Sequence, residues 1–183
     1  MKEEQNRAVL MKLIMSLRSK GSWCGETHIQ KAAYFLKHLT DVPVDFDFIL
    51  YKHGPFSFEL SDELSVMRTF DLLNMENRYP YGPRIEDTNM GGKLCNRYPK
   101  TLAKYKKQIN YIADKLGDKG VVDLEKLATA YYVTLENSDK DEDIRADIIV
   151  ELKPHIKPEA AKQAVQEVDA FIEQVEQKNL RAA

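Results

Sequence analysis

The residues best suited to chemistry in this chain are its histidines and cysteines, and their spacing forms no recognisable motif. The four histidines are His28, His38, His53 and His155. None has a histidine or cysteine partner at the short spacings that metal sites use. The two cysteines, Cys24 and Cys95, are too few and too far apart for a disulfide framework, which favours a reducing compartment. We therefore expect neither a metal ion nor a cofactor, and we interpret Cys24 as a small buried hydrophobe.

Motifs for nucleophilic catalysis and for phosphate binding are also missing. No G-x-S-x-G turn occurs, and Gly91-Gly92-Lys93 is interpreted as a turn because it matches no phosphate-binding loop. The acidic run from Asp139 to Asp143 is typical of a solvated loop. The sequence therefore predicts a protein that is not an enzyme.

Two segments remain as candidate binding surfaces. The first is Tyr51-Lys52-His53-Gly54-Pro55-Phe56-Ser57, whose Gly-Pro corner could present aromatic and basic side chains to a partner or simply fill the core. The second is the lysine-rich stretch 97–119, which could follow a phosphate backbone or be the outer face of an ordinary amphipathic helix.

The elements that must position these segments are mostly helical. Apolar residues recur at helical spacing over about 9–17, 29–39, 57–70, 102–116, 124–135, 144–152 and 158–175. Thr27 and Gln30 predict a capping box, and Ser57 is the expected N-cap of the third helix. Residues 45–51 favour a strand, and residues 74–92 predict a hairpin or a long ordered loop. The expected fold class is therefore mainly α with a small β component.

The order of the first elements is that of a winged-helix module. We expect residues 1–96 to form this module and residues 97–183 to form a helical bundle packed on it. No stretch approaches the roughly 18 apolar residues of a membrane span, and the first residues lack the pattern of a signal peptide, so a cytoplasmic protein is expected. A formal net charge of −2 argues against a generic nucleic-acid coat protein.

Two segments of the first half resemble a known family pattern. Residues 28–36, His-Ile-Gln-Lys-Ala-Ala-Tyr-Phe-Leu, are similar to the "L-Q-K-x-x-Y" helix of YwgA-like bacterial proteins and of the SocA-like, or Panacea, antitoxin domain. Residues 48–60, which contain Tyr-Lys-His-Gly-Pro-Phe-Ser, are similar to the "Y-G-P-x-S-x-x-L" segment of the same families. The resemblance covers roughly residues 8–75. It implies a winged-helix-related domain without catalytic residues and, in the antitoxin branch, neutralisation of a toxin by direct binding.

Two functional hypotheses follow. The first is an antitoxin-like protein that binds a partner protein, such as a toxin, through Tyr51, Lys52, His53, Pro55, Phe56 and Arg68. The alternative is a winged-helix transcriptional regulator, with residues 77–84 as its wing, that binds DNA through Arg68, Arg78, Arg84, Lys100, Lys104 and Lys107. Carboxylates at Glu59, Asp62 and Glu63 on the would-be recognition helix would repel phosphates, which favours the first hypothesis. A homodimer is compatible with both.

Overall fold

The computed structural model describes residues 1–79 and 82–182, which form eight α-helices and two short antiparallel hairpins. Because 66% of the described residues are helical, the predicted fold class, mainly α with a small β component, is confirmed. No helix in the described part of the chain is long and apolar enough to cross a bilayer.

The first half of the chain contains four helices and both hairpins. Its elements are α1 (Glu3–Ser19), α2 (Glu26–Thr40), β1 (Ile49–Tyr51), β2 (Gly54–Phe56), α3 (Phe58–Thr69), β3 (Leu73–Arg78), β4 (Gly82–Asp87) and α4 (Asn89–Arg97). The second half contains α5 (Pro99–Leu116), α6 (Val121–Glu136), α7 (Glu142–Leu152) and α8 (Pro158–Gln177). In the hairpins, Ile49 lies opposite Phe56 and Leu73 lies opposite Asp87.

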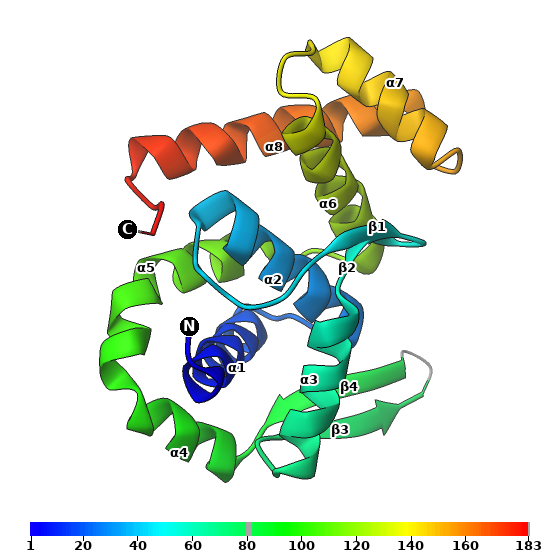
Figure 1. The fold of residues 1–183 in the computed structure, drawn as a ribbon. Helices are drawn as coiled ribbons and strands as arrows, with labels where there is room; N and C mark the ends of the chain where they lie inside the picture. The colour runs from blue at the N-terminus through cyan, green and yellow to red at the C-terminus, as the bar shows by residue number, and fades with distance from the viewer. Residues whose placement is uncertain (80–81, 183) are drawn as a thin grey trace.

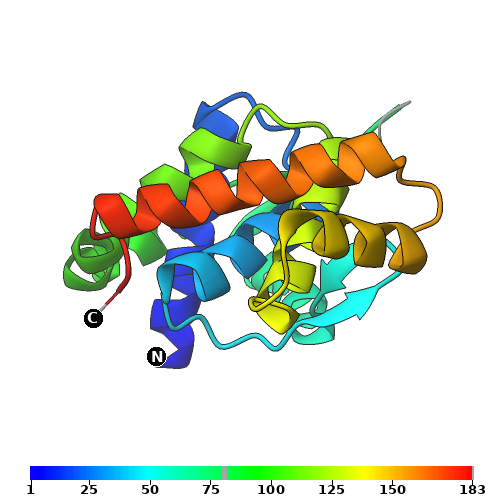
Figure 2. The same cartoon turned by 90° about the horizontal axis from the view of Figure 1, so that it is seen from above.

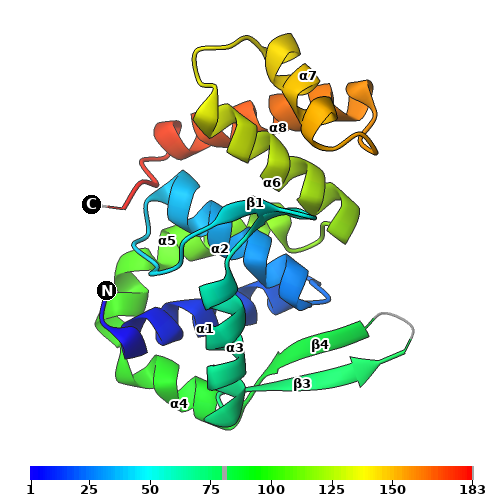
Figure 3. The ribbon, with the colours of Figure 1, turned by 45° about the vertical axis from the view of Figure 1, so that its right-hand side comes forward.

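The helices form two groups along the molecule. Helices α6, α7 and α8 form a layer at one end, beyond α2 (Figure 1). Seen from that end, α8 crosses most of the width of the molecule (Figure 2). The β3–β4 hairpin extends from the opposite half, on the side of α1 away from α5 (Figure 3). The two hairpins therefore lie in different parts of the molecule.

The expected strand over 45–51 is in fact one arm of a hairpin. Residues 41–48 belong to no helix or strand, and the chain then forms β1, turns at Lys52-His53 and returns as β2. Gly54 follows this turn at φ +83°, a conformation that side-chain-bearing residues rarely adopt. Ser57 is the N-cap of α3, as predicted, because its Oγ accepts a hydrogen bond from the Leu60 amide.

Two local expectations are wrong. The capping box at Thr27 does not form, because α2 begins at Glu26 with Gly25 as its N-cap and the Gln30 side chain bonds elsewhere. The hairpin expected over 74–92 ends at Asp87, and Gly91-Gly92-Lys93 lies inside α4 rather than in a turn. The Thr88 hydroxyl accepts from the Gly91 amide at 3.1 Å and so begins this helix despite its glycines. Residues 80 and 81 of the expected wing lie outside the described residues.

The β3–β4 hairpin has one backbone link to the segment before α2. The Ile85 amide donates to the Cys24 carbonyl at 2.9 Å, which ties β4 to the body of the molecule. Cys24 is fully buried, as predicted, and burial raises the pKa of its thiol to about 12. At this position the cysteine is an inert part of the core.

Both halves of the chain contribute to one hydrophobic cluster. It includes Leu13 and Leu36 from the first half and Ile109, Leu127 and Val168 from the second. Helix α5 packs along α1, and α6 packs along α2. The division of the chain near residue 96 stays a prediction, since the packing continues across it.

Candidate protein-binding surface at the Gly-Pro hairpin

The β1–β2 hairpin is fixed from beneath by the helix that precedes it. Gln30 is fully buried on α2, and its amide makes two hydrogen bonds to one residue. Its Oε1 accepts from the Ser57 amide and its Nε2 donates to the Ser57 carbonyl, both at 2.9 Å. Because Ser57 also caps α3, Gln30 sets where the hairpin ends and the next helix begins.

Two lysines hold the rest of the hairpin. Lys31 is 1% exposed, and its ammonium donates to the Pro55 carbonyl at 2.8 Å. Lys153, between α7 and α8, donates to the carbonyls of Tyr51 and Lys52 at 2.6 Å each. Desolvation lowers the pKa of Lys31 to about 8, against the attraction of Glu125 and with further lowering by Lys153.

The tip of the hairpin is tied to the second half of the chain through one carboxylate. Glu125 of α6 places Oε2 3.3 Å from His53 Nδ1 and Oε1 3.2 Å from His155 Nε2. In the described part of the chain no three His, Cys, Asp or Glu side chains are arranged to hold a metal ion. Lys31 is closed off from solvent, and its bond to Pro55 holds the hairpin together with the contacts of Glu125 and Lys153.

The outer face of the hairpin is apolar and exposed. Ile49 and Tyr51 are each 52% exposed, and Phe58 at the start of α3 is 56% exposed. The Phe56 ring lies 5.8 Å from that of Tyr51 and 5.1 Å from that of Phe58, so the rings form one cluster. We call Ile49, Tyr51, Phe56 and Phe58 the aromatic patch. Exposed apolar side chains gathered in this way are typical of interaction sites.

Most residues predicted to bind a partner lie at this hairpin. Tyr51, Lys52 and His53 are exposed on it, and Phe56 is half-buried beside them. Pro55 is buried, and its carbonyl accepts the bond from Lys31, so its role is structural.

Arg68 stands apart from the hairpin. It lies at the opposite end of α3, where its guanidinium contacts the Met75 sulfur at 3.8 Å. The sequence reasoning missed Ile49 and Phe58. Side chains of a strand point alternately to its two faces, so a strand over 45–51 places Ile49 on the same face as Tyr51. This pattern could have identified Ile49 from the sequence.

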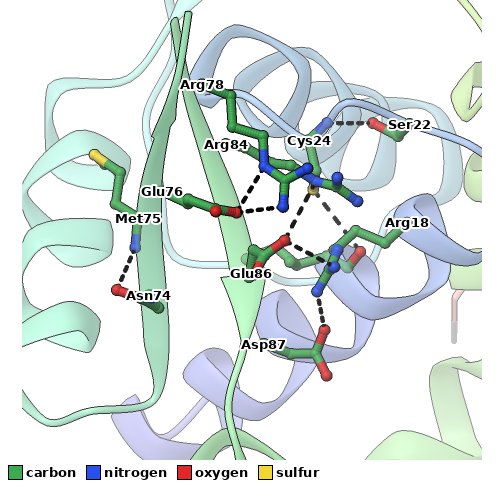
Figure 4. Close-up of polar contacts among 11 residues, drawn as sticks. Arg18, Ser22, Cys24, Asn74, Met75, Glu76, Arg78, Arg84, Glu86 and Asp87 are labelled. Atoms are coloured by element: carbon green, nitrogen blue, oxygen red, sulfur yellow. Dashed lines mark hydrogen bonds and ion pairs between the residues drawn. The ribbon is translucent and has the colours of Figure 1, made fainter.

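The residues predicted to bind nucleic acid do not form one basic surface. On the β3–β4 hairpin, Arg78 pairs with Glu76 at 2.7 Å and Arg84 pairs with Glu86 at 3.5 Å. Figure 4 shows Arg18 of α1 reaching Glu86, the partner of Arg84, and also Asp87 of β4. The positive charge of this hairpin is therefore largely balanced by its own acidic residues.

The predicted lysine stripe forms on α5, away from the β3–β4 hairpin. Lys100, Lys104 and Lys107 are all exposed on α5. Helix α5 lies on the far side of α1 from the β3–β4 hairpin (Figures 1 and 3). A duplex lying against the hairpin would not meet these lysines.

A separate pocket of about 570 Å³ lies between the start of α2, the β3–β4 hairpin and the turn before α6. Trp23, Met75 and Val121 give it apolar walls. Glu26 and Lys119 bring opposite charges to its lining, and Lys119 pairs with Glu167 at 2.8 Å.

No protein-family model matches the chain, and a comparison with curated proteins finds no match. The function is therefore inferred from the surface itself.

Proposed function

We propose that this chain is a non-catalytic, antitoxin-like protein that neutralises a partner protein by direct binding through the aromatic patch. The observation that carries this proposal is the contrast between the two faces of the β1–β2 hairpin. Its inner face is held by Gln30, Lys31 and Lys153, while its outer face leaves Tyr51 and Phe58 more than half exposed.

This contrast has an energetic meaning. Each Å² of apolar surface left in water loses about 25 cal/mol of hydrophobic stabilisation. Folding alone therefore does not favour a cluster of exposed apolar side chains. A rigid support also reduces the entropy lost when a partner orders the surface. Aromatic side chains on a fixed backbone are frequent energetic centres of protein interfaces.

The family resemblance fits this division of roles. Its shared residues, Gln30, Lys31, Gly54, Pro55 and Ser57, are all buried or nearly so. They build the hairpin, whereas Tyr51 and its exposed neighbours would select the partner.

DNA binding is the weaker proposal. The arginines of the β3–β4 hairpin are paired with carboxylates, and the lysine stripe lies on a different side of the molecule. A regulator that used these residues would bind duplex DNA with an affinity that falls steeply as salt rises.

The proposal is tested by capture followed by neutralisation. The tagged chain is purified from its own cells with nuclease treatment, and the protein that co-purifies in stoichiometric amount is expressed in host cells. We expect that protein to arrest growth and the intact chain to restore it. The double variant Y51A/F58A should bind the partner at least tenfold more weakly and fail to restore growth.

The matched control is Tyr79→Ala, which truncates an aromatic side chain that is fully exposed just after β3, on the other hairpin. It should behave like the unchanged chain. Rescue by a folded Y51A/F58A protein would contradict the proposal. So would a parallel capture without nuclease that recovers salt-labile nucleic acid in place of a protein.

A further inference from the structure

The segment that leads into the aromatic patch has a regular two-residue pattern of exposure. Asp45, Asp47, Ile49 and Tyr51 are exposed, and the residues between them are buried or half-buried. Because side chains of an extended chain alternate between its faces, these four lie on one face. The patch is therefore continued at one end by two carboxylates.

Helix α3 extends this acidic region. Glu59 follows Phe58 directly, and Asp62 lies four residues after Phe58, one helical turn along the same face. The Asp47 amide donates to Glu59 Oε2 at 2.7 Å, so the two acidic stretches adjoin. We call Asp45, Asp47, Glu59 and Asp62 the acidic strip.

The acidic strip is poorly neutralised by the rest of the described residues. Asp47 pairs with Lys37 at 3.0 Å. Asp45, Glu59 and Asp62 have no ion-pair partner among residues 1–79 and 82–182, and all three are exposed. A partner that covers both features must therefore bring positive charge to the strip.

The backbone of the same segment is already occupied. Asn6 Oδ1 accepts from the Asp45 amide at 3.1 Å, and Glu59 accepts from the Asp47 amide. Lys37 donates to the Phe46 carbonyl, and Lys153 donates to the Tyr51 carbonyl. A strand added along residues 45–47 would find these main-chain groups taken, so recognition beside the carboxylates falls to side chains.

We infer that the partner docks a basic amphipathic helix on this surface, with apolar side chains on the aromatic patch and lysines or arginines on the acidic strip. This inference rests on the proposed function and adds the chemistry of the partner. A helix presents side chains alone, because its own backbone hydrogen bonds are internal. Its apolar and charged faces match the two parts of the surface.

The test uses two synthetic peptides and the full chain. One is an 18-residue amphipathic helix of leucine and lysine with a fluorescent label, and its twin has glutamate in place of every lysine. Fluorescence anisotropy at 50 and 300 mM NaCl measures their affinities. We expect the lysine peptide to bind at least tenfold more tightly than its twin, with an advantage that shrinks at high salt.

Variants then locate the binding. E59Q/D62N should weaken the lysine peptide about three- to tenfold, and the glutamine side chain introduced by E59Q can still accept the bond from the Asp47 amide. E173Q/E176Q neutralises two exposed carboxylates with the same spacing on α8 and should leave the affinity unchanged. Y51A/F58A should weaken binding of the lysine peptide at least tenfold.

Equal affinity for the two peptides, or equal effects of E59Q/D62N and E173Q/E176Q, would overturn the inference. If binding of the captured partner protein required Tyr51 and Phe58 but did not change with Glu59, Asp62 or salt, the inferred basic helix would be wrong and the proposed function would stand. If the partner did not depend on Tyr51 and Phe58, the proposed function would fail, whatever the peptides do.

Discussion

Gln30 and Lys31 are adjacent in the sequence and hold two different points of the same hairpin. The neutral side-chain amide of Gln30 makes hydrogen bonds to both the backbone amide and the backbone carbonyl of Ser57. Lys31 brings an ammonium to the Pro55 carbonyl in a site that is 1% exposed. A buried amide with both groups satisfied is stabilising, whereas a buried ammonium whose acceptor is a neutral carbonyl carries a desolvation penalty. The two residues therefore differ in how their contributions respond to pH.

Lys31 should make the stability of the chain rise at alkaline pH. Its pKa is about 8 in the folded chain and 10.5 for an unperturbed lysine, mainly because of desolvation. Below pH 8 both states hold the proton and the full penalty is present. Between pH 8 and 10.5 the folded state loses its proton first, so the unfolded state binds more protons and the free energy of unfolding increases with pH.

The measurement is urea unfolding of the unchanged chain and of Lys31→Met at several pH values from 7.5 to 10.5. The unchanged chain should gain up to about 3 kcal/mol relative to Lys31→Met across this range. Lys107→Met, which removes an exposed lysine of α5, should show no such gain. A constant difference between the unchanged chain and Lys31→Met would mean that the ammonium is not desolvated.

Single residues also mark how far the site could be predicted from the sequence. Tyr51 and Phe56 were identified because an aromatic pair beside Gly-Pro is conspicuous. Lys31 and Lys153 were not, because lysine is seldom buried and their acceptors are carbonyls that only the fold brings near. Arg68 was grouped with the corner because it lies on the helix that follows the corner, although it is at the far end of α3.

At the scale of elements, the spacing of apolar residues predicted every helix of the described chain except α4. The apolar repeats of α5 and α8 predict them correctly because these helices are amphipathic over 18 and 20 residues. Helix α4 has only nine residues and two glycines, so its local propensity points to a turn. Its Thr88 cap and its packing against α1 outweigh that propensity.

The two glycines of α4 should respond in opposite ways to alanine. A Cβ on Gly91 would stand 2.4 Å from the Leu72 carbonyl oxygen and 2.8 Å from the Met11 sulfur, so Gly91→Ala must displace backbone. A Cβ on Gly92 would meet nothing within 4 Å. We expect Gly91→Ala to destabilise the chain by about 1–3 kcal/mol and Gly92→Ala to stabilise it by about 0.5–1 kcal/mol. Urea midpoints of the two variants give the comparison, and a similar response from both would show that α4 does not approach the Leu72 backbone this closely.

At the scale of the whole molecule, the sequence predicted the class of fold but not how its halves share a core. Charge and composition change near residue 97, which suggests a boundary. The packing does not stop there, since the Phe35 ring of α2 stacks on the Tyr131 ring of α6 with centroids 5.1 Å apart. Such contacts join residues far apart in the chain, and spacing within one segment cannot indicate them.

A shared core predicts that the two halves unfold together. Trp23 is the only tryptophan of the chain and lies just before α2, where it faces the turn before α6, so its fluorescence reports on the first half and on its contact with that turn. Far-UV circular dichroism reports on all helices, including those of the second half. We expect the two signals to give the same urea midpoint.

The decisive variant is Leu127→Ala, which opens a cavity in α6 at a residue that is 2% exposed. It should lower the free energy of unfolding by about 2–4 kcal/mol and shift the tryptophan and circular dichroism midpoints by the same amount, because α6 packs on α2 in the same cluster. Leu135→Ala, at an exposed position of the same helix, should shift neither midpoint appreciably. If Leu127→Ala moved only the circular dichroism midpoint, residues 97–183 would be an independent domain, and the hairpin would not depend on Glu125 and Lys153 for its support.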